Sequence, residues 1–414
     1  MNALSSEKLQ SCRICGSTRI EAILDLGKQP PANSLREKKE EILQTVPLVL
    51  CRCQDCATLQ LNETVSPDYL FRHYVWVTGT SKAAQQYSRV FCEQLGKRGR
   101  EGQRFVVEVA SNDGTFLKVF QERGDKVLGI DPAQNIATMA SERGVPTLQE
   151  FFGSEIARGV VARHGPADIV FARNVVSHVA NPNDFLAGMA HCLREDGIGA
   201  IEFHRADVIL EELHYDSIYH EHLFYHSLHS VQELLRRAGL SLFDVTYSSI
   251  SGGSAVAYFA KQSLPATDCM QRMLDRERAL GITESSPWHK FAQRCEAHRR
   301  RLGSAIARAK DAGKRLIGYG ASARSSTLLN YCGIDHRHLE LIADKNPLKH
   351  GRYTPGTDIR IVAPEQALAR QPDSVLLLAW NFREEILAEL KDDYGWTGEL
   401  IVPLPGDPVV IQTA

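Results

Sequence analysis

The chain lacks an apolar run of the roughly 20 residues that cross a bilayer. Its first residues, MNALSSEKLQ, also lack the basic and then apolar segments of a secretion signal. Charge of one sign is missing too, because 48 Lys and Arg nearly balance 50 Asp and Glu, for a net charge of −2. We therefore expect a cytoplasmic protein with no membrane partner and no general nucleic-acid-binding surface.

Cysteine is scarce overall but clustered at the start. Ten cysteines in 414 residues are too few for a disulfide scaffold. Cys12-x2-Cys15 and Cys53-x2-Cys56 form two knuckles, and four thiolates complete a tetrahedral zinc site with no open coordination position. The spacing therefore predicts a structural zinc module over residues 1–65. Unliganded core cysteines are the alternative, and Cys51 is either a spare or a register ambiguity with Cys53.

Beyond this module, strand and helix patterns alternate twice along the chain. The runs RFVVEVA, KVLGID, ADIVFARN and GIGAIEFH predict a parallel sheet in an α/β domain over residues 66–261. Residues 262–312 lack strand signals and predict a helical linker. RLIGYG, ELIADKNP, SVLLLAWN and ELIVPLP predict a second α/β domain over 313–414. The expected fold class is therefore α/β with two Rossmann-like sheets.

The first sheet carries a turn suited to a nucleoside. The stretch from Glu108 to Gly114 links a buried strand to a helix, where small residues allow close approach and the helix offers free N–H groups. Asp131 ends the next strand, where its carboxylate can bind ribose hydroxyls. Because G-x-G-x-x-G is missing, S-adenosylmethionine is favoured over NAD; a plain sheet-to-helix turn is the alternative. The candidate cofactor residues are Glu108, Ala110, Ser111, Asn112, Asp113, Gly114, Asp131 and Asn174.

A polar cluster follows in DSIYHEHLFYHSLHS. Tyr219, Glu221 and His222 place a phenol, a carboxyl and an imidazole together, which suits proton removal beside a hydrogen-bonded enolate. Metal binding is disfavoured because H-E-H lacks the i, i+4 histidine pair of H-E-x-x-H helices. A solvated polar turn is the other alternative. His178, after a buried strand, is either functional or structural.

Two further glycine turns are weaker signals. Gly252-Gly253-Ser254 invites close backbone approach or simply joins two strands. The turn Gly318–Ser322 precedes a helix and suits a phosphate or nucleotide, but it has one G-x-G and no evident acidic partner after the next strand. A tight structural turn is equally compatible with it. An NAD(P)-dependent oxidoreductase or epimerase would use this second turn.

In this order, the motifs resemble those of the sugar C-methyltransferase family of deoxysugar biosynthesis, which methylates C-3 of nucleotide-linked 4-keto sugars. The resemblance covers nearly the whole chain. The matching segments are the two cysteine knuckles with CATLQL, EVASNDGTFL, NVVSHV, DSIYHEHLFYHSL, YGASAR and KNPLKHGRYTPGT. It implies a zinc module, a middle class I S-adenosylmethionine methyltransferase domain and a C-terminal Rossmann-like domain.

The resemblance also assigns roles. It implies that His222 is the general base, with Tyr219, Glu221 and His178 around a nucleotide-sugar substrate. Tyr74, in YVWVTGTS, matches an aromatic pair near the substrate, although its second member is Trp76 where the family often has Tyr.

Two departures concern the substrate side. Ser251 and Val256 stand where the family commonly has His and Arg, and Arg324-Ser325-Ser326 replaces the usual Lys-Gly-Asn. The expected reaction is methylation next to a ketone through an enolate. A different keto substrate is the alternative within the family, and a zinc-module scaffold or nucleic-acid binder is disfavoured by the charge balance.

Overall fold

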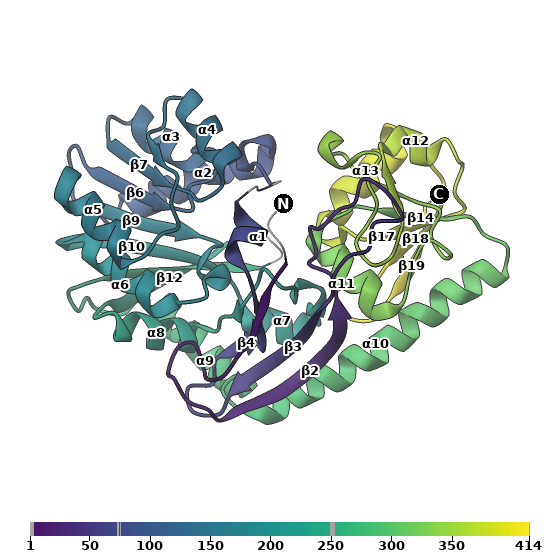
Figure 1. The fold of residues 1–414 in the computed structure, drawn as a ribbon, viewed down its shortest axis with the longest axis horizontal. Coiled ribbons are helices and arrows are strands. Elements are labelled where there is room, and N and C mark those ends of the chain that lie inside the picture. Colours follow the sequence, from purple (N-terminus) through teal and green to yellow (C-terminus); the bar gives the residue numbers. More distant parts are fainter. Residues whose placement is uncertain (1–3, 73, 75, 249–252, 414) are drawn as a thin grey trace.

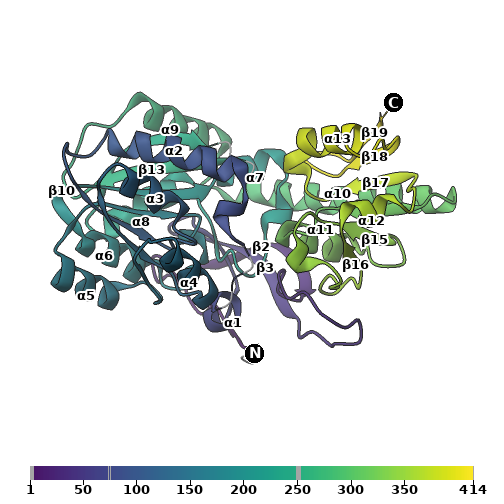
Figure 2. The same cartoon turned by 90° about the horizontal axis from the view of Figure 1, so that it is seen from above.

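The computed structural model describes residues 4–72, 74, 76–248 and 253–413. Two α/β lobes stand side by side, and the N-terminal strands and a long helix run beneath them (Figure 1). The view from above shows the same two lobes on either side of β2 and β3 (Figure 2). In the part of the chain that is described, no helix combines the length and apolarity needed to cross a membrane.

The N-terminal module is an antiparallel sheet completed by a distant strand. A long hairpin, β2 (Ile20–Gln29) and β3 (Val46–Cys53), pairs with β4 (Leu59–Leu61). The fourth strand is β11 (Phe224–Tyr225), which comes from within the predicted 66–261 domain. A separate short pair joins β1 (Ser6–Lys8) to β5 (Glu63–Val65). In space, the module is therefore not a single continuous segment of sequence.

The middle lobe is a seven-stranded sheet, parallel except for one reversed strand. Its β6 is buried at every residue, as expected of a parallel strand covered on both faces. β13 is inserted antiparallel between β10 and β12. In pairing order the strands are β12 (Ser241–Ser248), β13 (Ser254–Ala260), β10 (Leu193–His204), β9 (Ala167–Arg173), β6 (Phe105–Val109), β7 (Lys126–Ile130) and β8 (Thr147–Leu148).

Helices cover both faces of this sheet. Phe91 and Phe116 pack on one face and Phe185 and Met189 on the other. The first face carries α2 (Lys82–Gly96), α3 (Thr115–Glu122) and α4 (Gln134–Glu142), and the second carries α5 (Ser154–His164), α6 (Pro182–Cys192) and α8 (Leu228–Arg237). Shorter helices are α1 (Pro67–Phe71), η1 (Thr78–Thr80), η2 (Val176–His178), α7 (Ala206–Glu212) and η3 (Tyr215–Ser217).

The C-terminal lobe holds a six-stranded sheet whose last strand is antiparallel. In pairing order its strands are β16 (Arg360–Val362), β15 (Leu341–Ala343), β14 (Leu316–Tyr319), β17 (Ser374–Leu377), β18 (Gly398–Val402) and β19 (Val409–Thr413). Its helices are α11 (Ala323–Cys332), η5 (Pro347–Lys349), α12 (Pro364–Leu368), η6 (Trp380–Phe382) and α13 (Arg383–Asp392).

Two helices, α9 (Asp268–Leu280) and α10 (Ser285–Asp311), lie between the two large sheets in sequence. Every third or fourth residue of α10 is buried, as in Trp288, Phe291 and Leu302. One stripe of the helix therefore faces the core, and the charged residues on its other side face solvent.

The hydrophobic core places the N-terminal module between the two lobes. Leu50 and Leu59 belong to the same buried cluster as α10 and the C-terminal sheet. Cys53 and Phe224 instead belong to the cluster of the middle sheet. The module therefore packs against both lobes at once, and its hairpin is part of the framework around the candidate site.

Candidate active site

The turn after β6 has the backbone of a close-approach loop. Ala110 (φ 54°) and Asn112 (φ 49°) adopt left-handed conformations, and Gly114 (φ 77°) precedes α3. The Ala110 N–H donates to the carbonyl oxygen of Ile130 at 2.7 Å, which ties the turn to the end of β7. The free N–H groups at the start of α3 thus open beside the carboxyl ends of the strands.

Buried polar atoms around this turn fit a bound ligand. Glu108 is buried, its Oε2 has no hydrogen-bond partner among the described residues, and burial raises the pKa of its carboxyl well above the usual value. Ser111 is also buried, and its side chain packs against Gly129. Asn174, just after β9, adopts φ 51° and donates its backbone N–H to the carbonyl oxygen of Glu202 at 2.9 Å.

Two of the predicted cofactor residues also hold a crossing segment. Asn112 accepts from the Thr78 N–H at 2.8 Å and donates to the Trp76 carbonyl at 3.1 Å. Asp113 accepts from the Gly79 N–H at 3.0 Å and pairs with Arg143. Their side chains therefore clamp residues 76–80 over the turn, a cover that the motif alone did not reveal.

Asp131 directly follows β7, as the sequence pattern predicts for a ribose-binding carboxylate. It is nearly buried, and its two oxygens accept the backbone N–H groups of Asn112 and Ala133, each at 2.9 Å. Burial raises the pKa of this carboxyl, and the two N–H donors oppose that rise. The carboxylate is thus fixed at the turn, and each oxygen keeps a lone pair for a hydroxyl.

His222 and Tyr219 form a hydrogen-bonded pair. Tyr219 Oη lies 2.7 Å from His222 Nε2, and His222 Nδ1 lies 3.0 Å from the carbonyl oxygen of Ser217. The two rings lie close, with centroids 4.0 Å apart. Burial, followed by neighbouring His178 and Arg324, lowers the pKa of His222 well below its usual value. The imidazole is therefore neutral near neutral pH.

His178 faces the same pair from the middle sheet. Its ring meets His222 edge-on at 4.9 Å and Phe71 edge-on at 5.5 Å. Burial lowers the pKa of His178 to about 4. Its Nδ1 has no hydrogen-bond partner within the described ranges. The structure thus places a second neutral imidazole in contact with His222, the predicted base.

Glu221 and Tyr74 complete the cluster. Glu221 is 3% exposed, and burial raises its pKa to about 7 even though the Asn33 side-chain amide donates to its Oε1 at 2.6 Å. Burial, together with the carboxyls of Glu221 and Asp131, raises the pKa of Tyr74. Tyr74 therefore lies near both the predicted base cluster, formed by His178, Tyr219, Glu221 and His222, and the turn after β6. Asn135 fixes the backbone of Tyr74 through hydrogen bonds of 3.2 and 2.8 Å.

Three residues that contact the segment Asp216–Glu221 were not predicted from the sequence. Asn33 comes from the loop between β2 and β3, and Thr327 and Trp380 come from the C-terminal lobe. None lies in a motif, and each meets its partner across more than 100 residues. Only the contact in space identifies them.

The second glycine turn has the acidic partner that sequence reading missed. Asp344 follows β15, and its Oδ2 accepts from the Ala321 N–H at 2.7 Å, as Asp131 accepts from Asn112 in the first sheet. Lys349 also donates to this oxygen at 3.2 Å. The strand before Asp344 has only three residues, and this shortness obscured the pattern.

Of the two positions in and before β13 that depart from the family pattern, the described residues include Val256 but not Ser251. Ser251 and Gly252 lie outside the described residues. Val256 is buried in β13 among the apolar residues of one face of the middle sheet. In this chain, position 256 therefore contributes to packing.

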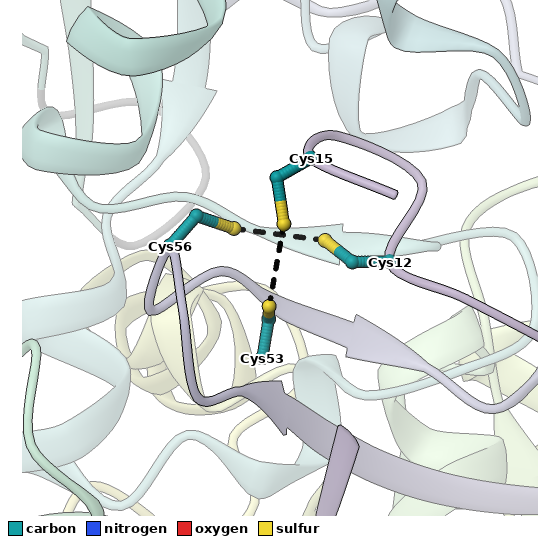
Figure 3. Close-up of side chains that lie close together, drawn as sticks. All are labelled: Cys12, Cys15, Cys53 and Cys56. Carbon is teal, nitrogen blue, oxygen red and sulfur yellow. Dashed lines mark hydrogen bonds between the residues drawn. The ribbon is translucent and has the colours of Figure 1, made fainter. Parts of the chain in front are cut away.

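The four predicted metal ligands converge. Sγ of Cys12 lies 3.6 Å from that of Cys56, and Sγ of Cys15 lies 3.5 Å from that of Cys53 (Figure 3). All four sulfurs lie within 4.8 Å of one another. Zn–S bonds of about 2.3 Å in a tetrahedron put sulfurs about 3.8 Å apart, so the cluster fits zinc and is too open for disulfides. Cys51 lies outside it.

The sheet order, the turn after β6 and the four-cysteine cluster together define an S-adenosylmethionine-dependent methyltransferase with a structural zinc module. Family models match the chain as a zinc binding domain over residues 12–71, a methyltransferase domain over 81–245 and a C-methyltransferase C-terminal domain over 249–405. C-methyltransferase NovU of Streptomyces niveus is 34% identical over 409 residues, which cover 98% of this chain and 97% of NovU. The chain therefore belongs to the C-methyltransferase family.

Solved methyltransferase structures resemble only part of the chain. Magnesium protoporphyrin IX methyltransferase of Synechocystis is 13% identical with a TM-score of 0.34, over 43% of this chain and 79% of that one. A 1,6-didemethyltoxoflavin-N1-methyltransferase of Burkholderia thailandensis is 17% identical with a TM-score of 0.33, over 45% and 81% of the two chains.

Proposed function

We propose that this C-methyltransferase acts on a nucleotide-linked 4-keto deoxysugar and methylates the carbon next to the ketone. His222 is the general base, and the reaction passes through an enolate. The turn after β6 and Asp131 hold the methyl donor, and Tyr74, Tyr219, Glu221 and His178 surround the sugar. Support comes from the family, from the resemblance to sugar C-methyltransferases and from the hydrogen bonds of His222.

The tautomer of His222 carries this proposal. A carbonyl oxygen only accepts, so the ring proton resides on Nδ1 and is donated to Ser217. Nε2 then carries the lone pair and accepts the Tyr219 O–H. A neutral imidazole with its Nε2 lone pair held in place is able to accept the proton of a C–H bond next to a ketone.

The surrounding groups suit an enolate. As the substrate carbon gives its proton to His222 Nε2, negative charge moves to the ketone oxygen and needs hydrogen-bond donors. The Tyr219 phenol, no longer engaged by Nε2, is one donor. Glu221 is the second, because burial raises its pKa to about 7 and keeps part of the population protonated at neutral pH.

S-adenosylmethionine, when bound by the turn after β6 and Asp131, would supply an electrophilic methyl group to the nucleophilic carbon and would leave as S-adenosylhomocysteine. The protein's contribution is to hold the two reactants at near-attack distance. Tyr74 suits that role, because the carboxyls of Asp131 and Glu221 both act on its hydroxyl. The clamp on residues 76–80 fixes the segment that follows it.

A different keto substrate is the second candidate. It is favoured by Arg324, whose guanidinium lies 5.6 Å from the Trp380 ring and whose charge lowers the pKa of His222, after the larger effects of burial and His178. The family usually has Lys at position 324. A changed cation beside the base cluster is expected to alter which substrate is accepted.

The test is incubation of the zinc-loaded protein with methyl-labelled S-adenosylmethionine and a panel of nucleotide 4-keto-6-deoxysugars in deuterated water, followed by mass spectrometry. The expected product is heavier by one methyl, and its fragments identify the carbon. His229→Ala, an exposed histidine of α8, is the control for His222→Ala. Binding of the donor without methylation or deuterium exchange on any sugar would overturn the sugar assignment, and methylation of other ketones would support the second candidate.

A further inference from the structure

The segment Tyr219–His222, which is the catalytic segment under the proposed function, continues directly into the sheet of the zinc module. After His222, β11 pairs with β4, with Phe224 opposite Gln60. One residue earlier, the Leu223 carbonyl accepts from the Leu61 N–H at 3.0 Å. His220 Nε2–H donates to the Val46 carbonyl at the start of β3, at 3.1 Å. The segment around Glu221 is therefore held to the zinc module by hydrogen bonds on both sides.

The loop between β2 and β3 reaches the same carboxyl from the other side. Pro30, Pro31 and Ala32 are buried, and they present Asn33, whose Nδ2 donates to Glu221 Oε1 at 2.6 Å. Three residues on, Arg36 exchanges backbone hydrogen bonds with Tyr353 at 3.1 and 2.8 Å. This pairing fixes the position of the loop against the C-terminal lobe.

The Arg36 side chain strengthens the anchor. It is 5% exposed, pairs with Asp358 and donates to the Thr354 carbonyl at 3.3 Å. A buried guanidinium with these partners is costly to disturb. Asn33 is thus held between a buried anchor on the C-terminal lobe and the catalytic segment.

We propose that Asn33 is a positioning residue of the active site, supplied by the zinc module, which holds the Glu221 carboxyl in place and controls its protonation. The inference rests on the role of Glu221 as an enolate donor under the proposed function. It extends that function because it makes the module contribute directly to the chemistry and not only to stability.

The Asn33 amide determines the direction in which the pKa of Glu221 changes. An amide N–H stabilises the ionised carboxylate and opposes the effect of burial. The other titratable or charged groups that face this cluster are Tyr74, His178, Tyr219, His220, His222 and Arg324. All of them remain when Asn33 is changed. Loss of the donor should therefore raise the pKa of Glu221 above about 7.

The test measures Glu221 itself and needs no substrate. In protein labelled with carboxyl-¹³C glutamate, the signal lost in Glu221→Gln identifies the residue. Asn33→Ala should shift its titration upward by at least half a pH unit. Asn33→Asp, nearly the same size, should shift it further because a second carboxyl is added. Glu277, whose pKa burial also raises to about 7, should titrate unchanged as an internal reference.

A neighbouring variant supplies the matched control. Ser34→Ala changes the next residue, whose hydroxyl contacts Tyr69 at 3.0 Å and not Glu221. Its Glu221 titration should match that of the unaltered protein. If neither Asn33 variant moves the Glu221 signal, Asn33 has no positioning role. That result is separate from the substrate screen, whose failure would leave the titration shift intact.

Discussion

The indole Nε1–H of Trp380 donates to Oδ2 of Asp216, six residues before His222, at 2.7 Å. Both residues are buried. Close by, Thr327 Oγ1–H donates to the Ile218 carbonyl at 2.8 Å. The backbone that presents Tyr219 and His222 therefore belongs to the middle domain in sequence but is held by the C-terminal lobe. Docking of that lobe and the geometry of the proposed base, His222, should therefore be coupled.

Trp380→Phe should destabilise the protein by about 1–3 kcal/mol, because it removes a donor from a buried carboxylate. Burial raises the pKa of Asp216, and the Trp380 donor opposes that rise. Without the donor, the folded-state pKa rises further. A raised carboxyl pKa costs stability as pH rises through it, so the loss should be larger at pH 8 than in acid. Urea unfolding across this pH range measures it.

Trp396→Phe is the matched control. Its indole N–H also donates within the fold, but to the Pro372 carbonyl at 2.9 Å, which does not titrate. Its cost should be similar in size and independent of pH. Equal pH dependence in the two variants would show that Asp216 is not the group responsible.

Local patterns predicted the parts of the site that are local in sequence. The C-x2-C knuckles imply zinc because each pair already lies within one turn, and the pattern repeats. The stretch Glu108–Gly114 predicts a cofactor turn because the strand, the turn and the helix are consecutive. Tyr219, Glu221 and His222 stand out because they are adjacent.

The remaining parts depend on contacts between distant segments. Asn33 meets Glu221 across 188 residues, and the only local signal is the pair of prolines before it. The strand β11 is two residues long, too short for a periodicity to indicate that it completes the N-terminal sheet. Asn112 and Asp113 bear the polar side chains of a ligand site, and here they also hold residues 76–80. Residue type alone does not distinguish these two uses.

His222→Ala should lower kcat by roughly 10²–10⁴-fold, the usual contribution of a positioned general base. It should also abolish deuterium exchange at the substrate carbon. Tyr219→Phe removes an enolate donor but leaves Nε2 free, so it should retain exchange and lose part of the methylation rate. Full turnover in His222→Ala with none in Tyr219→Phe would exchange the two roles.

The pH profile of kcat/KM should fall above about pH 7, because ionisation of Glu221 removes a hydrogen-bond donor. On the acid side activity should persist below pH 6, since burial lowers the pKa of His222 well below its usual value and that of His178 to about 4. Glu221→Gln keeps a neutral donor and should lose the alkaline fall. A fall near pH 7 that survives in this variant belongs to another group.

Removal of zinc should unfold the N-terminal module and with it the proposed catalytic segment Tyr219–His222, which leads into the shared sheet at β11. Apparent zinc-binding free energies are about 10–16 kcal/mol in small zinc domains, so the free energy of unfolding should fall by at least several kcal/mol. The chain should bind one zinc by elemental analysis, and Cys53→Ser should bind none tightly. Cys51→Ala, outside the cluster, should keep its zinc; a loss of metal there would place Cys51 among the ligands.

Gly79→Ala should weaken binding of S-adenosylmethionine, because an added Cβ would collide with the Asp113 carboxylate and come within 2.9 Å of Thr115 Oγ1. The crossing segment would then lift from the turn that it covers. Calorimetry with the methyl donor measures the effect, and an affinity loss of about tenfold or more is expected, since the clash displaces the buried Asp113 carboxylate from its contacts with Gly79 and the half-exposed Arg143. Gly159→Ala is the control: its Cβ meets nothing within 4 Å in α5, and the change should add about 0.5–1 kcal/mol of stability. Equal donor affinity in both variants would show that residues 76–80 do not cover the bound cofactor.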